Sequence, residues 1–231
     1  MPVLPGCPPV DILLRRSARA TRFSLRVSSL DGRVTLSVPA RAREADAMAF
    51  ARSQEGWLRA ALAKRTKPVA MGFGSSVLIE GAEVVLRPGT GRAAKLEGTS
   101  LLLPGAEAQA ATRTAAYLRA MARDRLAEAS DHYAGLVGRK VTRITLRDTR
   151  SRWGSCNHDG ALMYSWRLVM APPSVLRYVA AHECAHLVEM NHSDAFWAVV
   201  ERLYPNWSRE RAWLHANGAR LHAYRFDADV A

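Results

Sequence analysis

Residues 172–197 are PPSVLRYVAAHECAHLVEMNHSDAFW, and this stretch decides which fold the sequence predicts. The two prolines suit the first turn of a helix, and apolar residues follow them at helical spacing. Asn191 is a residue type that tolerates the left-handed backbone with which many helices end. We therefore predict a helix from about residue 174 to residue 190, and this helix carries most of the motif HECAHLVEMNH.

Two histidines of this motif are spaced to share a metal ion. His182 and His186 are four residues apart, so on a helix they project from one face, one turn apart. Two imidazoles at this spacing suit a tetrahedral zinc ion, and the Glu183 carboxylate can then act as general base toward a metal-activated water. This is the H-E-x-x-H pattern of metalloproteases. The alternative is a helix with two hydrogen-bonded histidines, but Val175 and Val179 continue the histidine stripe, which should face the core.

A zinc site needs a further protein ligand, and three residues compete for that position. His192 lies six residues after His186, just past the predicted helix end, where the chain can turn back. Glu189 lies on the predicted helix itself, and we expect it to point too far from the metal. Glu201 belongs to the next predicted helix. The sequence favours His192, with Glu201 as the second choice, and it predicts Zn²⁺ as the cofactor.

The composition is that of a globular protein with a large positive charge. The 231 residues carry a formal net charge of +12, nearly all from arginine, and the basic residues are spread along the whole chain. This spread argues against nucleic-acid binding as the main function. Cys7, Cys156 and Cys184 are widely spaced, which predicts neither a disulfide framework nor a cysteine zinc site. No apolar run is long enough to span a bilayer, and no signal peptide is evident. We therefore expect a cytoplasmic protein without a membrane segment.

The chain divides into two predicted regions of an α+β fold. Residues 1–105 are strand-rich, with a hairpin around Asp31-Gly32 and one helix over about 43–65. Residues 106–231 begin with a long amphipathic helix over about 107–133. A strand, a β-hairpin and the motif helix follow. Ser193 is the expected cap of a helix over residues 194 to about 203, and Ser208 is the expected cap of a last helix that runs to about residue 221.

The residues around the motif resemble those of a known family. The segments RDTRSRWGSC at 147–156 and WRLVMAPPSVLRYVAAHECAHLVEMNHSDAFW at 166–197 are similar to the YgjP-like metallopeptidase domain family, which is related to the WLM and SprT-like zincins. The resemblance implies a zincin-like catalytic part after the strand-rich region. It also implies zinc ligands at His182, His186 and His192, and a catalytic glutamate at Glu183. Relatives often have asparagine in place of Ser165.

The bond that the site cleaves is a separate question. The resemblance implies a peptidase, with the hairpin strand beside the metal helix pairing with a peptide or protein substrate. Arg152 could hold a carboxylate or phosphate of the substrate, and Tyr164 or Tyr178 could donate to an oxyanion. A nucleotide pyrophosphohydrolase is one alternative, with phosphates held by flanking arginines; these are Arg147, Arg150, Arg152 and Arg167. A DNA-associated protease or binding module is the other, favoured by the net charge and by the SprT-like kinship.

Overall fold

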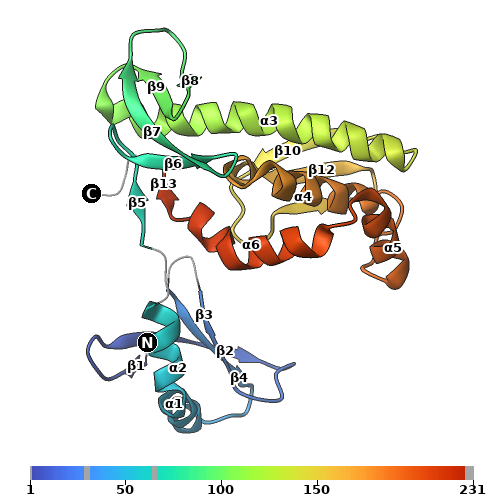
Figure 1. Cartoon of the computed structure of the whole chain (residues 1–231). Coiled ribbons are helices and arrows are strands. Elements are labelled where there is room, and N and C mark those ends of the chain that lie inside the picture. Colours follow the sequence, from blue (N-terminus) through green and yellow to red (C-terminus); the bar gives the residue numbers. More distant parts are fainter. Residues whose placement is uncertain (1, 29–31, 64–66, 227–231) are drawn as a thin grey trace. The chain divides into compact units, whose positions relative to one another are not determined.

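The computed structural model describes residues 2–28, 32–63 and 67–226, which form two compact units divided between Lys67 and Pro68. The α+β fold class is confirmed (Figure 1). The boundary differs from the one expected near residue 105. Strands within 68–105 pack with the second unit because their apolar residues, such as Leu86 and Leu101, belong to its core. No helix in the described ranges is long and apolar enough to cross a membrane.

Unit 1 is a four-stranded sheet with two helices. The strand order is β1-β2-β4-β3, and β4 buries every second residue, as expected for a sheet with one face on the core. The expected antiparallel pair is β3 with β4, although Asp31 of its turn lies outside the described residues. β2, which runs parallel to β4, was not predicted, and the single predicted helix is two helices that meet at Gln54. The bounds are β1 Val3–Leu4, β2 Val10–Ser17, β3 Ser24–Val27, β4 Val34–Pro39, α1 Glu44–Ser53 and α2 Glu55–Ala63.

Three sheets lie within the described part of unit 2, residues 68–226. One has the order β6-β7-β9-β8, and β13 pairs with β5 in a second. The third has the order β10-β12-β11, with β10 parallel and β11 antiparallel to the central β12, so β11 lies at an edge. The strands are β5 Val69–Ala70, β6 Ser76–Ile79, β7 Ala82–Gly89, β8 Lys95–Glu97, β9 Ser100–Pro104, β10 Arg143–Arg147, β11 Gly154–Cys156, β12 Ala161–Ser165 and β13 Tyr224–Arg225.

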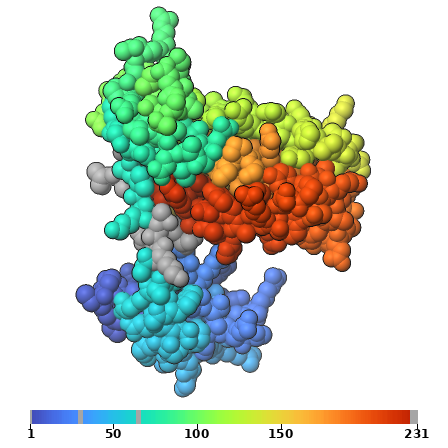
Figure 2. Space-filling model, viewed as in Figure 1, coloured from blue at the N-terminus to red at the C-terminus, as the bar shows by residue number. Residues whose placement is uncertain are grey.

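The helices of unit 2 surround α4, which contacts α3, α5, α6 and strand β11. The long helix α3 runs along the unit in Figure 1, and α6, in red, forms much of the visible surface of this unit in Figure 2. Because α4 is packed on several sides, residues at its end are held in a fixed setting. The helical elements are η1 Glu107–Gln109, α3 Ala110–Leu136, η2 Trp166–Met170, α4 Pro173–Ala185, α5 Asp194–Leu203 and α6 Trp207–Leu221.

The helix ends around the motif follow the predictions in part. α5 has the predicted bounds, and Ser193 caps it by accepting a hydrogen bond from the Phe196 amide at 3.4 Å. α6 begins at Trp207, so Ser208 is not its cap. The prediction that α4 continues to about residue 190 is wrong, because the helix ends at Ala185. The chain therefore turns before the motif is complete.

Candidate metal centre

Three histidine side chains converge where α4 ends. His182 lies on the last turn of α4, His186 follows the helix directly, and His192 immediately precedes the cap of α5. One ring nitrogen from each histidine lies within 4.8 Å of the others, and the Nε2 atoms of His182 and His192 are 3.1 Å apart. The early end of α4 thus brings together residues that are up to ten positions apart in the sequence.

The donor set fits a metal ion. Two ligands of a tetrahedral zinc, each about 2.0–2.1 Å from the ion, are roughly 3.3 Å apart, close to the separation of the His182 and His192 nitrogens. His182 directs Nε2 toward His192, while its buried Nδ1 has no hydrogen-bond partner among the described residues, so Nε2 is the atom placed to bind an ion. His186 Nδ1 lies 2.9 Å from the Glu189 carbonyl oxygen, and donation there leaves Nε2 free, as in oriented metal ligands. These histidines therefore form a group that could hold a divalent metal.

The electrostatic setting of two of the imidazoles favours their neutral form. Burial, followed by the neighbouring His186 and His192 rings, lowers the pKa of His182 to about 3. Burial also lowers the pKa of His186, although the Glu189 carbonyl opposes this shift. Neutral imidazole is the form that binds metal, because a protonated ring has no free lone pair.

Aromatic rings of α5 hold the histidines in place. Phe196 is fully buried, and its ring stacks on His186 with centroids 4.3 Å apart. The same ring meets His182 and His192 edge-on, at 4.9 and 4.7 Å. Trp197 lies 6.0 Å from the His192 ring. The DAFW segment that follows the motif therefore packs against all three imidazoles and restricts their rotation.

Glu183 lies beside these rings and against the edge strand β11. Its side chain is buried, and this burial raises the pKa of the carboxyl to about 8, although the Arg152 guanidinium opposes the shift. A Cβ atom at position 154 would lie 2.5 Å from Glu183 Oε1, so only glycine allows the strand to approach so closely. This contact gives a physical reason for the glycine in RWGSC.

A pocket of about 350 Å³ opens beside Glu183, lined by α4, α6 and the loop that leads into β11. Arg152 lines it, as does Tyr178, whose hydroxyl makes no hydrogen bond within the described part of the chain. Arg211 and His215 of α6 also line the pocket, and sequence reasoning missed them. They are four residues apart on one helix face, but that signal does not show which element the face meets.

Other candidates from the sequence lie elsewhere. Tyr164 is fully buried, and its hydroxyl lies 3.0 Å from Ser130 Oγ in a hydrogen bond, so it does not face the pocket. The Glu201 carboxylate accepts a hydrogen bond from Trp207 Nε1 and is not part of the histidine group. Burial raises the pKa of the Cys156 thiol to about 11, which keeps it protonated.

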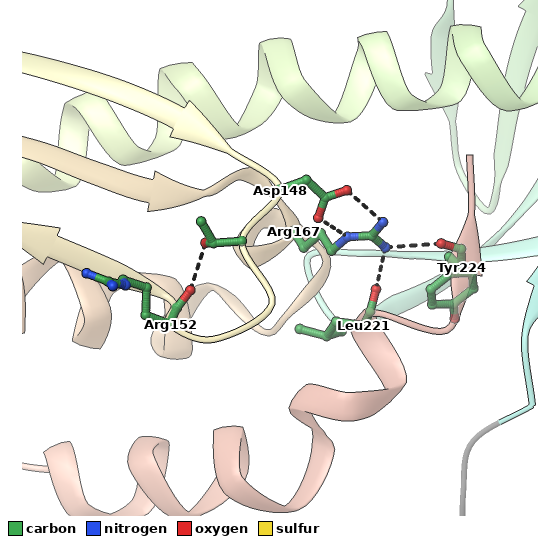
Figure 3. A network of polar contacts seen from close by, with 6 residues as sticks. Asp148, Arg152, Arg167, Leu221 and Tyr224 are labelled. Atoms are coloured by element: carbon green, nitrogen blue, oxygen red, sulfur yellow. Dashed lines mark hydrogen bonds and ion pairs between the residues drawn. The ribbon is translucent and has the colours of Figure 1, made fainter. Parts of the chain in front are cut away.

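The four arginines that the sequence placed near the site differ in availability. Arg167 is buried, and its guanidinium contacts Asp148 in two hydrogen bonds of 2.6 and 2.9 Å. It also donates to the carbonyl oxygens of Leu221 and Tyr224, at 2.8 and 3.1 Å (Figure 3). The Arg167 guanidinium therefore joins the loop before β11 to the end of α6 and is not free for a ligand.

A family model described as "YgjP-like, metallopeptidase domain" matches residues 21–217. Searches among curated proteins and among solved structures found no match. The matched residues include strands β3 to β12, among them the edge strand beside Glu183, and all three histidines. The match covers most of the sequence and includes the whole candidate site, and on that basis the chain belongs to the YgjP-like metallopeptidase domain family.

Proposed function

We propose that this chain is a zinc-dependent peptidase in which His182, His186 and His192 hold the metal and Glu183 is the general base. The observation that carries this proposal is the convergence of three imidazoles, next to the buried carboxyl group of Glu183. Imidazole ligands suit zinc among the available metals. When bound, zinc supplies a Lewis acid that lowers the pKa of water toward about 7 and polarises a carbonyl group.

Side chains and main-chain groups of this protein would carry out proton transfer, oxyanion stabilisation and peptide binding. Because burial raises the pKa of Glu183 to about 8, its ionised form takes a proton from the attacking water, and the protonated form then returns this proton to the leaving amine nitrogen. Burial raises the pKa of the Tyr178 hydroxyl, which therefore stays protonated and can donate to the developing oxyanion. An extended peptide would lie along the edge strand β11, where main-chain groups can add a strand to the sheet.

The alternative functions stay predictions. A nucleotide pyrophosphohydrolase would need several free arginines near the site, and Arg167 is already occupied by Asp148 and two carbonyl groups. Arg147, Arg150 and Arg152 are exposed and remain available to either class of substrate. We favour the peptidase because it agrees with the family to which the chain belongs.

Replacement of His192 by alanine is expected to weaken zinc binding by more than about 100-fold, because it removes a direct ligand and not merely an outer contact. Zinc content after dialysis and competition with a chelating dye would measure the change. His215→Ala and Glu201→Gln are the matched controls, since both residues lie outside the histidine group and should leave the affinity unchanged. A His192→Ala protein with wild-type affinity, or an affinity loss in Glu201→Gln alone, would contradict the proposed ligand set.

Replacement of Gly154 by alanine is expected to reduce the rate of peptide hydrolysis by roughly 100-fold, because a small displacement of a catalytic group is costly. The added methyl group would meet the Glu183 carboxylate, which must move from its place beside the histidines. Hydrolysis of a peptide pool and zinc content should be measured together, and zinc content should not change. Gly135→Ala on α3, where an added Cβ atom would meet nothing within 4 Å, serves as the matched control. Equal activity of Gly154→Ala and wild type would show that Glu183 tolerates this displacement.

A further inference from the structure

The sheet beside the site has a polar outer face. On β10, Ile144 and Leu146 pack against the core of unit 2, so the alternate residues Arg143, Thr145 and Arg147 face the other side. The strand register pairs Thr145 with Met163 of β12 and Met163 in turn with Ser155 of β11. Directly paired residues share a face, so one continuous surface crosses all three strands.

A groove of about 560 Å³ lies over this outer face and is strongly basic. Arg143, Arg147 and Arg152 line it, together with hydroxyl and amide side chains such as Thr145, Ser151 and Asn157. The described lining contains neither aspartate nor glutamate. The groove therefore presents three guanidinium groups and several neutral hydrogen-bonding groups without a carboxylate to neutralise them.

The three arginines of the groove differ from other arginines of unit 2 because they have no ion-pair partner among the described residues, although the Arg152 guanidinium acts electrostatically on Glu183. Arg143, Arg147 and Arg152 are exposed, and none of them forms an ion pair with another residue that the structure describes. Arg125 and Arg220, by comparison, each contact a glutamate at 2.7 Å. A guanidinium without an internal partner is free to bind a carboxylate through two parallel hydrogen bonds.

Arg152 connects this groove to the catalytic pocket, because it lines both. Its main chain is held in place, since the Arg152 carbonyl oxygen accepts a hydrogen bond of 2.8 Å from Thr149 Oγ1. Its guanidinium extends away from the Arg167 network (Figure 3). A ligand that lies in the groove can therefore continue past Arg152 to Glu183.

The spacing of the arginines indicates what kind of ligand fits. Arg143 and Arg147 are four residues apart on one strand, roughly 13 Å, and side chains on a strand stand about perpendicular to the sheet. An extended ligand with several negative groups matches this spacing better than a single small anion. The described lining of the groove has no aromatic ring on which a nucleobase could stack, which favours a peptide over single-stranded nucleic acid.

We propose that this basic groove binds an acidic segment of the peptide substrate, while the scissile bond lies beside Glu183. The inference rests on the proposed peptidase function and adds the substrate class, namely peptides with several aspartate or glutamate residues on one side of the cleaved bond. Arg143 and Arg147 act as specificity-determining residues that contact the substrate away from the reacting atoms, and Arg152 lies between them and the catalytic pocket.

Binding without turnover tests the groove directly. In a Glu183→Gln background, a fluorescently labelled peptide of alternating glutamate and alanine should bind, and its glutamine counterpart should bind more weakly. Arg143→Gln/Arg147→Gln is expected to weaken binding of the glutamate peptide about tenfold, as two charge-assisted contacts are lost. The control is Arg123→Gln/Arg202→Gln, which removes the same charge from exposed positions of unit 2 outside the groove. Fluorescence anisotropy measures the affinities, and circular dichroism checks folding.

Two results would overturn the proposal. One is equal binding of the glutamate and glutamine peptides, or equal loss in the groove and control variants. The other is a labelled oligonucleotide of matched charge that binds more tightly than the glutamate peptide and depends on Arg143 and Arg147. Measurement of turnover distinguishes a failure of the groove proposal from a failure of the proposed peptidase function. Cleavage of a random peptide pool by the zinc-loaded wild type without acidic preference would overturn the groove alone, whereas no cleavage of any peptide would contradict the peptidase.

Discussion

Glutamine in place of Glu183 is expected to lower the rate of peptide hydrolysis by about 10²–10⁴-fold, the usual contribution of a positioned general base. Glutamine has nearly the same shape but cannot take a proton from water. Zinc binding should be retained, because the three histidines and their aromatic supports are unchanged. Zinc content, measured by mass spectrometry, and hydrolysis of a random peptide pool, measured on the same samples, would report both effects.

The same substitution should not reduce stability. The Glu183 side chain is 5 % exposed, and burial raises the pKa of its carboxyl to about 8, so folding of the metal-free protein at neutral pH must protonate this group, a cost that a neutral amide avoids. The unfolding midpoint of Glu183→Gln should therefore match or exceed that of the wild type. Glu189→Gln is the control, because Glu189 contributes only its main-chain carbonyl to the site. A Glu183→Gln protein with full zinc and the wild-type rate would exclude Glu183 as the general base.

Local spacing was sufficient to predict much of the site. The bounds of α5 were predicted correctly because Ser193, a strong capping residue, stands directly before an apolar helical pattern. His182 and Glu183 lie on a helix that starts at the predicted prolines. These features depend on residues within a few positions of one another, and such patterns are visible in a single sequence.

Features that depend on contacts between distant segments could not be predicted. Gly154 meets Glu183 across the gap between strand and helix, and Arg211 reaches the pocket from α6. Tyr164 looked available in sequence, but it lies on the face of β12 that packs against α3, where Ser130 binds its hydroxyl. Alternation along a strand defines two faces, yet it does not say which of them a helix will cover.

The position of the domain boundary has a similar explanation. Residues 68–105 have the same strand-rich composition as the residues before them, so composition alone grouped the two regions. The apolar residues of β6, β7 and β9 pack into the core formed with α3 and α4, and this packing assigns them to unit 2. Only contacts that are far apart in sequence distinguish the two groups of strands.

Methionine in place of Arg167 is expected to lower the free energy of unfolding by about 3–5 kcal/mol, the usual cost of removing one partner from a buried ionic network. Methionine retains much of the apolar packing against Trp166 and Phe226, over which the guanidinium lies. The main loss is hydrogen bonding, since the carbonyl groups of Leu221 and Tyr224 would lack their donor. Urea unfolding would measure the change, with Arg123→Met as the control at an exposed position.

Comparison of Asp148→Asn with Arg167→Met tests which contacts of Arg167 contribute most to the free energy of unfolding. The Asp148 side chain is 41 % exposed, so water can replace the guanidinium there, whereas Arg167 itself is almost fully buried. We therefore expect Asp148→Asn to cost only about 1 kcal/mol, near the value of a partly exposed pair. If Asp148→Asn were as damaging as Arg167→Met, the ion pair would be the dominant contact. If it costs much less, Arg167 acts mainly by binding the carbonyl groups at the end of α6, and the loop that leads to Gly154 depends more on its own contacts, such as the hydrogen bond from Thr149 Oγ1 to the Arg152 carbonyl oxygen.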